Sequence, residues 1–234
     1  MTLDLGAANS HIDFGVGNAG GLGNGAFTML VLWRLGSPNS NTGLLGGTAL
    51  GLDRQCYGLD TNHIFGQGDF SSGFGTLTPP DWYWLGLSKP AGAAHYRGHF
   101  RDYSTAGAWS HGEAVGAGNH TDPGVSTGIQ VGSSISSFTS GNGGVAVAAV
   151  WTSVLADLAI EAAATSALAD LLTAAPQWAA KFNVGFTTAP IQDLTAGGGN
   201  ETSRSGTLTE TADPPGYSFA LGVSPARLFL PFFR

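Results

Sequence analysis

The segment from Gly141 to Leu172 changes its hydrophobic period midway, and this change constrains the fold more than any other stretch. It begins with a glycine turn and continues as GGVAVAAVW, a run that is apolar on both faces and ends at Trp151. A short strand without a polar face belongs inside a packed sheet layer. After Trp151 the apolar residues recur at helical spacing, with Asp157 and Glu161 on the remaining faces. The pattern therefore predicts a central buried strand followed by a short helical cap.

Within the strand, alternation predicts two apolar faces at period two. The alanines on the second face are small enough to let another element pack closely, and Thr165 and Ser166 can divide the cap into two short helices. The expected faces are Val145, Val147, Ala149 and Trp151 on one side, and Ala146, Ala148 and Val150 on the other.

Composition favours a β protein with many tight turns. Glycine accounts for 37 of the 234 residues, and charged residues make up 11% against about 25% in typical domains. With 42% hydrophobic residues the chain does not have the composition of a disordered segment. Single β-sandwich domains reach this length.

Several segments upstream have the pattern of strands. Residues from Ser10 to Val16 alternate between apolar and polar, which indicates a half-buried strand. The segment from Ala26 to Arg34 is apolar at nearly every position and is expected near the centre of a sheet. Further strands are expected from Asp81 to Ser88 and from Gly128 to Gly132.

These segments, in this order, resemble the laminin G-like, concanavalin A-like jelly rolls. The closing signature of that family is a glycine, a hydrophobic run ending in Trp, an L-[S/A]-D motif and a helix. Here it reads GGVAVAAVW and then LAD from Leu155 to Asp157. The opening pair of strands is similar to ANSHIDFG followed by FTMLVLW. The resemblance implies an all-β fold, an antiparallel β-sandwich with a short helical cap after Trp151.

We expect a jelly-roll domain over residues 1–190 and an extension over residues 191–234. The extension should contain a polar arm from Thr195 to Gly216 and a strand from Tyr217 to Val223 that returns to the sheet. Termini are normally polar and frayed, yet this one ends in ARLFLPFFR. The tail should either pack on its own domain or dock into a partner. The residues expected to dock are Leu228, Phe229, Leu230, Phe232 and Phe233.

Charge and cysteine content argue against several classes of protein. The formal net charge is -7 with only nine Lys and Arg, whereas binding to nucleic acid needs a concentrated basic face. The single cysteine, Cys56, allows no internal disulfide and no cysteine-rich metal site. The N-terminal sequence shows no secretory signal, and no apolar run approaches the ~20 residues of a membrane helix.

The jelly-roll fold includes glycosidases, which need two carboxyl groups about 5 to 9.5 Å apart. On a strand the economical arrangement is two acids two positions apart, and no such pair occurs. The closest pairs are Asp157 with Glu161, on the expected helix, and Glu210 with Asp213. The spacing predicts that the chain has no catalytic residues and is not an enzyme. A cleft assembled from separate strands is the alternative left open.

The histidines are expected to be structural. His95 and His99 lie four apart, so a strand would place them on one face together with Arg97 and Arg101. Two guanidinium groups would repel a cation, which favours a polar sheet face over a zinc site. Two further pairs are expected in turns with surface hydrogen bonds: His111 with Glu113, and His120 with Asp122.

Calcium is the one ion that the resemblance implies, since it recurs in laminin G-like domains. By position the candidate ligands are Asp53, Asp60 and Asp69, which offer the oxygen ligands that calcium prefers. No D-x-[DN]-x-[DN]-G loop occurs, and no other cofactor is expected.

Aromatic residues gather between positions 82 and 109. Aromatic faces, with amide and carboxylate hydrogen bonds, hold sugars in lectins of this fold. Trp82 and Trp84 would share one face of a strand while Tyr83 takes the other, so one set should belong to the core. The candidates for glycan contact are Trp84, Tyr96, Tyr103 and Trp109.

The chain is similar to the free-standing jelly rolls among phage virion proteins, especially minor tail and capsid-decorating proteins. This resemblance implies a non-enzymatic virion component, folded in the host cytoplasm and free of membrane insertion. Its partners would be other virion proteins, further copies of itself in a homo-oligomer, and host-surface carbohydrate. The alternatives are a free carbohydrate-binding lectin and a divergent glycoside hydrolase.

Overall fold

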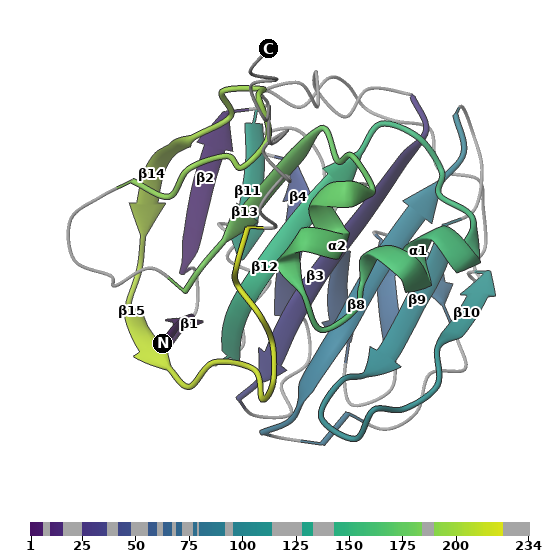
Figure 1. Cartoon of the computed structure of the whole chain (residues 1–234), viewed down its shortest axis with the longest axis horizontal. Coiled ribbons are helices and arrows are strands. Elements are labelled where there is room, and N and C mark those ends of the chain that lie inside the picture. The colour runs from purple at the N-terminus through teal and green to yellow at the C-terminus, as the bar shows by residue number, and fades with distance from the viewer. Residues whose placement is uncertain are drawn as a thin grey trace, which may run out of the picture.

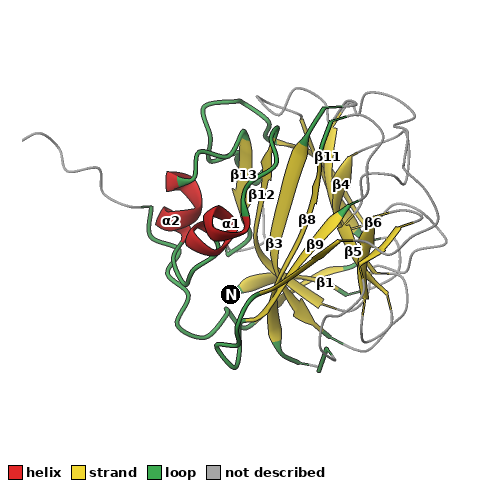
Figure 2. Ribbon diagram, turned by 90° about the vertical axis from the view of Figure 1, so that its right-hand side faces the viewer, coloured by secondary structure: helices red, strands yellow, loops and turns green. Residues whose placement is uncertain are grey.

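The computed structural model shows two antiparallel sheets stacked face to face, with two short helices on the outer side of one sheet (Figures 1 and 2). This confirms the predicted β-sandwich with its helical cap. Membership of the laminin G-like family stays a prediction. The structure describes residues 1–6, 10–15, 25–36, 42–47, 56–59, 63–66, 69–71, 77–78, 80–91, 96–113, 128–132, 143–183 and 190–221.

The first sheet lies under the helices and has β12 near its middle. Strand β3 pairs with β12 on one side, while β1 and β13 share its other side. In spatial order the sheet contains β10 (Ser110–Glu113), β9 (Arg97–Asp102), β8 (Trp82–Lys89), β3 (Phe27–Leu35), β12 (Gly143–Trp151), β1 (Thr2–Leu5) and β15 (Leu208–Thr211), with β13 (Trp178–Lys181) beside β12.

The second sheet covers the face of the first sheet that lies away from the helices (Figure 2). Its strands follow the order β14 (Glu201–Ser205), β2 (His11–Gly15), β11 (Gly128–Gly132), β4 (Thr42–Gly47), β5 (Cys56–Leu59), β6 (His63–Gly66) and β7 (Asp69–Ser71).

All nine residues of β12 are buried, as predicted for a central strand. The predicted division of its faces is wrong at two positions, Val145 and Ala146, each of which lies on the face predicted for the other. Val145 lies in the core between the sheets, whereas Val147 and Trp151 lie in the cluster under the helices. The register with β3 shifts between Val145 and Val147, and the extra residue at this bulge reverses the alternation.

The helical cap consists of α1 (Asp157–Ala163) and α2 (Leu168–Thr173), separated near Thr165 as expected. Buried Ile160 and Leu171 on the helices belong to the same cluster as the small Ala146 and Ala149 of β12. The sequence pattern placed Ala146 and Ala148 together on the closely packed face, but Ala148 lies in the core between the sheets, and Ala149 lies with Ala146 against the helices. No described helix has the length and hydropathy needed to cross a bilayer.

The segment predicted as a polar arm supplies two strands. β14 pairs with β2 in the second sheet, and β15 pairs with β1 in the first. The strand expected from Tyr217 is wrong over the described residues, where Ser218 makes only an isolated bridge to Ala167. Edge strands are held by backbone hydrogen bonds and can be polar on exposed positions, so hydrophobic alternation does not reveal them. The division at residue 190 stays a prediction.

Candidate functional site

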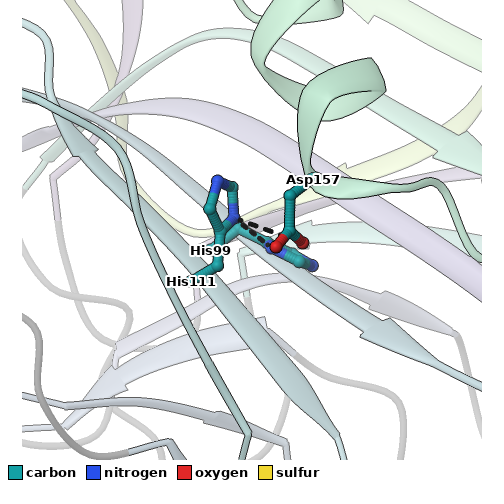
Figure 3. A group of neighbouring side chains, drawn as sticks. All are labelled: His99, His111 and Asp157. Carbon is teal, nitrogen blue, oxygen red and sulfur yellow. Dashed lines mark hydrogen bonds and ion pairs between the residues drawn. The ribbon is translucent and has the colours of Figure 1, made fainter.

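A cluster of polar side chains lies on the outer face of the first sheet, where α1 covers β9 and β10 (Figures 1 and 3). His99 of β9 and His111 of β10 are partners across the antiparallel ladder, so their side chains share one face of the sheet. Asp157 is the first residue of α1 and faces both rings (Figure 3). Three elements distant in sequence therefore bring two imidazoles and a carboxylate together.

The distances within the cluster are short. The Nδ1 atoms of His99 and His111 lie 2.8 Å apart. Nδ1 of His111 lies 3.7 Å from Oδ1 of Asp157. One ligand atom from each of these three residues lies within 4.8 Å of the others, so the three side chains could hold a metal ion.

Arg97 fixes the carboxylate of Asp157. Its Nε donates to Oδ1 at 3.0 Å and its Nη2 donates to Oδ2 at 2.5 Å. This bidentate ion pair joins β9 to the start of α1. This hydrogen bonding lowers the pKa of Asp157, against the opposing effect of partial burial. The carboxylate is therefore ionised at neutral pH.

His99 is the wholly buried member of the cluster. Burial is the main reason that its pKa falls to about 3, and the neighbouring His111 lowers it further. The ring is therefore neutral at physiological pH. Its Nε2 lies 2.9 Å from Oγ of Ser88 on β8.

His111 links the buried histidine to the surface. Its Nε2 lies 3.1 Å from Oε1 of Glu161, which is one helical turn after Asp157 on α1. The indole of Trp109 stacks on the ring of His111, with ring centroids 5.5 Å apart and planes inclined by 7°. The acid pair that the sequence placed on the helix thus lies against His111, on which Trp109 stacks.

The sequence predicted a polar sheet face at His99, and that face is present. It also predicted a turn at His111, which is wrong, because His111 lies in strand β10. The alternation that places Arg97 and His99 on one face is correct, but α1 covers that face. The covering helix comes 60 residues later than Arg97, so no local pattern could show it. The side chain of Glu113 and residues His95, His120 and Asp122 lie outside the described part of the chain.

The four aromatic candidates for glycan contact divide into two kinds. Trp84 and Tyr96 are buried, and the indole Nε1 of Trp84 donates to the Thr165 carbonyl, so these two rings belong to the core. Tyr103 and Trp109 are only partly buried beside the cluster under the helices. Glycan contact by Tyr103 and Trp109 stays a prediction.

The remaining sequence candidates fall outside what the structure describes. Asp53, Asp60 and the side chain of Asp69 lie in such segments, and the calcium site stays a prediction. The same holds for the tail residues expected to dock into a partner: Leu228, Phe229, Leu230, Phe232 and Phe233.

A hollow of about 270 Å³ lies between the two helices. Alanines make up most of its lining, and its polar side chains are Asp170 and Thr173. The carboxylate of Asp170 already accepts a hydrogen bond from Thr165. The hollow therefore offers few of the converging polar groups that fix a ligand, and the cluster at His111 is the stronger candidate.

No protein-family model and no curated protein matches the chain. Among solved structures it is similar to a Bacteroides ovatus protein provisionally assigned to carbohydrate binding, with a TM-score of 0.54 and 14% identity. That similarity covers 95% of this chain but 62% of the other, so the chain spans about three fifths of that protein. At this identity the similarity establishes the fold alone.

Sialidases of Trypanosoma rangeli are also among the similar structures. One, in complex with a difluorinated sugar acid, has a TM-score of 0.40 and 14% identity, and the similarity covers 66% of this chain and 26% of the sialidase. A second, a covalent intermediate, has a TM-score of 0.38 and 15% identity with the same coverage. The prediction that the chain is not an enzyme is therefore wrong, because it excluded a class found among the similar structures. The spacing of acids in sequence could not support that exclusion, since carboxylates meet across a fold.

Proposed function

We propose that this chain binds carbohydrate, and that the sugar lies beside Trp109 on the outer face of β9 and β10. The fold supports this, because the Bacteroides ovatus protein with the similar structure is provisionally assigned to carbohydrate binding. The cluster on this face has the side-chain types that sugar recognition uses.

The observation that carries the proposal is the arrangement around Trp109. Its partly buried indole is held flat against His111, so the ring loses little freedom when a ligand stacks on it. Arg97 and Asp157, which pair with each other, and Glu161, which contacts His111, add planar hydrogen-bonding groups to the same cluster, and their side chains are 33%, 35% and 38% exposed. Groups that are fixed by their neighbours yet reachable from solvent are what orient a polar ligand.

The test is glycan binding by the isolated chain, measured on an array of bacterial and animal oligosaccharides and then by calorimetry with the best ligand. Trp109→Ala removes the stacking surface and should weaken binding at least tenfold. Thr209→Ala is the matched control, because Thr209 is exposed on β15 at the opposite edge of the first sheet, and it should leave affinity unchanged.

Two results would oppose the proposal: absence of binding to every glycan, or equal binding by wild type and Trp109→Ala. The same samples are assayed for released reducing sugar. Release that is lost in Asp157→Asn or Glu161→Gln would support sugar recognition at this face and would add hydrolysis to it.

Placement of the chain in a phage virion, docked through its apolar tail and assembled as a homo-oligomer, remains a proposal from the sequence. Residues 222–234 lie outside the described part of the chain. Co-purification of the chain with phage particles would support this placement.

A further inference from the structure

We propose that His99, His111 and Asp157 form a binding site for a divalent transition-metal ion of the zinc type. The inference concerns the metal alone and does not depend on carbohydrate binding. It follows from how the two imidazoles are oriented.

The Nδ1 atoms of both imidazole rings point toward the same space between the rings. Both Nδ1 atoms face each other at 2.8 Å, with Oδ1 of Asp157 beside them (Figure 3). Two imidazole nitrogens and one carboxylate oxygen are a ligand set that zinc accepts, and a three-residue set leaves a position for water.

The outer nitrogen of each ring is held by a partner. Nε2 of His111 contacts Glu161 at 3.1 Å, and Nε2 of His99 contacts the hydroxyl of Ser88 at 2.9 Å. Histidines that bind metals usually donate the remote N–H to a carboxylate or another acceptor, which fixes the ring and its tautomer. The carboxylate of Glu161 beside His111 and the hydroxyl of Ser88 beside His99 are placed to be such acceptors.

Without metal, the hydrogen bonds define one consistent set of protons when both rings are neutral. His111 donates from Nε2 to the carboxylate of Glu161, so its Nδ1 accepts from Nδ1–H of His99, and Nε2 of His99 accepts from Ser88. Metal binding requires His99 to carry its proton on Nε2 instead and to donate it to the Ser88 oxygen. This exchange of tautomers changes no net charge.

The three ligand atoms lie within 4.8 Å of one another, so the geometry must adjust before one ion can bind all of them. Two nitrogens bound tetrahedrally to one zinc at about 2.0–2.1 Å lie roughly 3.3 Å apart, so the rings must separate by roughly 0.5 Å. His111 can supply this movement, because it lies on β10 at the sheet edge, whereas His99 is wholly buried. The ion reaches the site past Asp157, whose side chain is 35% exposed.

Arg97 opposes a cation by charge, but its guanidinium is occupied by Asp157. Each carboxylate oxygen has two lone-pair positions, so Oδ1 can accept from Arg97 and still bind a metal. Arg97 thus orients the third ligand while it reduces the affinity of the site.

The test uses the full chain with any affinity tag removed, titrated with Zn²⁺ by calorimetry and with Co²⁺ by visible absorption. Wild type should bind one ion per chain, with Co²⁺ bands of a low-coordinate nitrogen and oxygen site. His111→Asn keeps an acceptor for His99 and should weaken Zn²⁺ binding at least tenfold. Glu161→Gln should weaken it by about ten- to a hundredfold, as expected for a remote partner of a ligand.

His11→Ala is the control, because His11 also lies near a carboxylate, 3.7 Å from Asp13, but in the other sheet. It should bind Zn²⁺ as wild type does. Circular dichroism establishes that each variant is folded, and Zn²⁺ should raise the Tm of wild type but not of His111→Asn. Absence of stoichiometric binding in wild type, or equal affinity in folded His111→Asn, would show that the cluster only anchors α1.

Discussion

At the scale of single residues, alanine substitutions at two glycines with positive φ distinguish the cost of backbone strain from the cost of a steric clash. Gly132 has φ +85°, and a Cβ built there would lie 2.4 Å from the backbone oxygen of Ser10. Gly198 has φ +72° with no atom within 4 Å of the corresponding position. Gly132→Ala should therefore lower the free energy of unfolding by more than the ~1–2 kcal/mol expected for Gly198→Ala, where only the left-handed backbone opposes a side chain. Urea denaturation of both variants measures the difference, and equal losses would contradict the clash.

His99 should make stability depend on pH. The folded-state pKa of about 3 lies below the ordinary value of 6.5, so below about pH 6.5 the unfolded chain binds a proton that the folded chain does not. The stabilisation is complete above pH 6.5 and is lost as the pH falls toward 3, with a slope of up to about 1.4 kcal/mol per pH unit. Urea denaturation from pH 7 to 4, with a chelator present, measures this slope.

The titratable and charged groups that face His99 are His111, Asp157 and Arg97. His99→Gln removes the imidazole and retains a hydrogen-bonding side chain. The slope should become shallower in this variant, and an unchanged slope would assign the pH dependence to other groups.

At the scale of elements, burial divides α1 into two faces. Ile160 is wholly buried in the cluster under the helices, while Leu158, two residues earlier, is 78% exposed. Ile160→Ala should reduce the free energy of unfolding by about 2–5 kcal/mol, because it leaves a cavity between the helix and the sheet. Leu158→Ala is the matched control and should change stability by less than about 0.5 kcal/mol. Similar losses in the two variants would mean that α1 is not anchored as described.

Elements were predictable from sequence where burial leaves a hydrophobic period. The strand ending at Trp151 and the divided cap were predicted on that basis. The bulge between Val145 and Val147 was not predicted, because both faces of this strand are apolar and an extra residue leaves no break in the hydrophobic pattern. Polar β14 and β15 carry no such period. The cluster at His111 was missed for a related reason. Its partners Arg97, Asp157 and Glu161 meet only after α1 folds back over the sheet, which depends on tertiary packing.

At the scale of the whole molecule, the two sheets share one core. Ile129 of β11 and Phe14 of β2, from the second sheet, are buried in the same cluster as Val31 and Val145 of the first. Neither sheet can expose its inner face without exposing that of the other. Small domains built in this way usually unfold in one transition.

The tryptophans allow this to be tested, because five of the six lie in strands of the first sheet and Trp109 immediately precedes β10. Tryptophan fluorescence therefore reports on the first sheet, whereas far-ultraviolet circular dichroism reports on both. Ile129→Ala removes a wholly buried side chain from the second sheet and should reduce stability by about 2–5 kcal/mol. If the sandwich unfolds as one unit, the fluorescence midpoint in urea should fall as far as the dichroism midpoint. A fluorescence midpoint that stays at the wild-type value would mean that the first sheet, with its helices and the His99 cluster, is stable by itself.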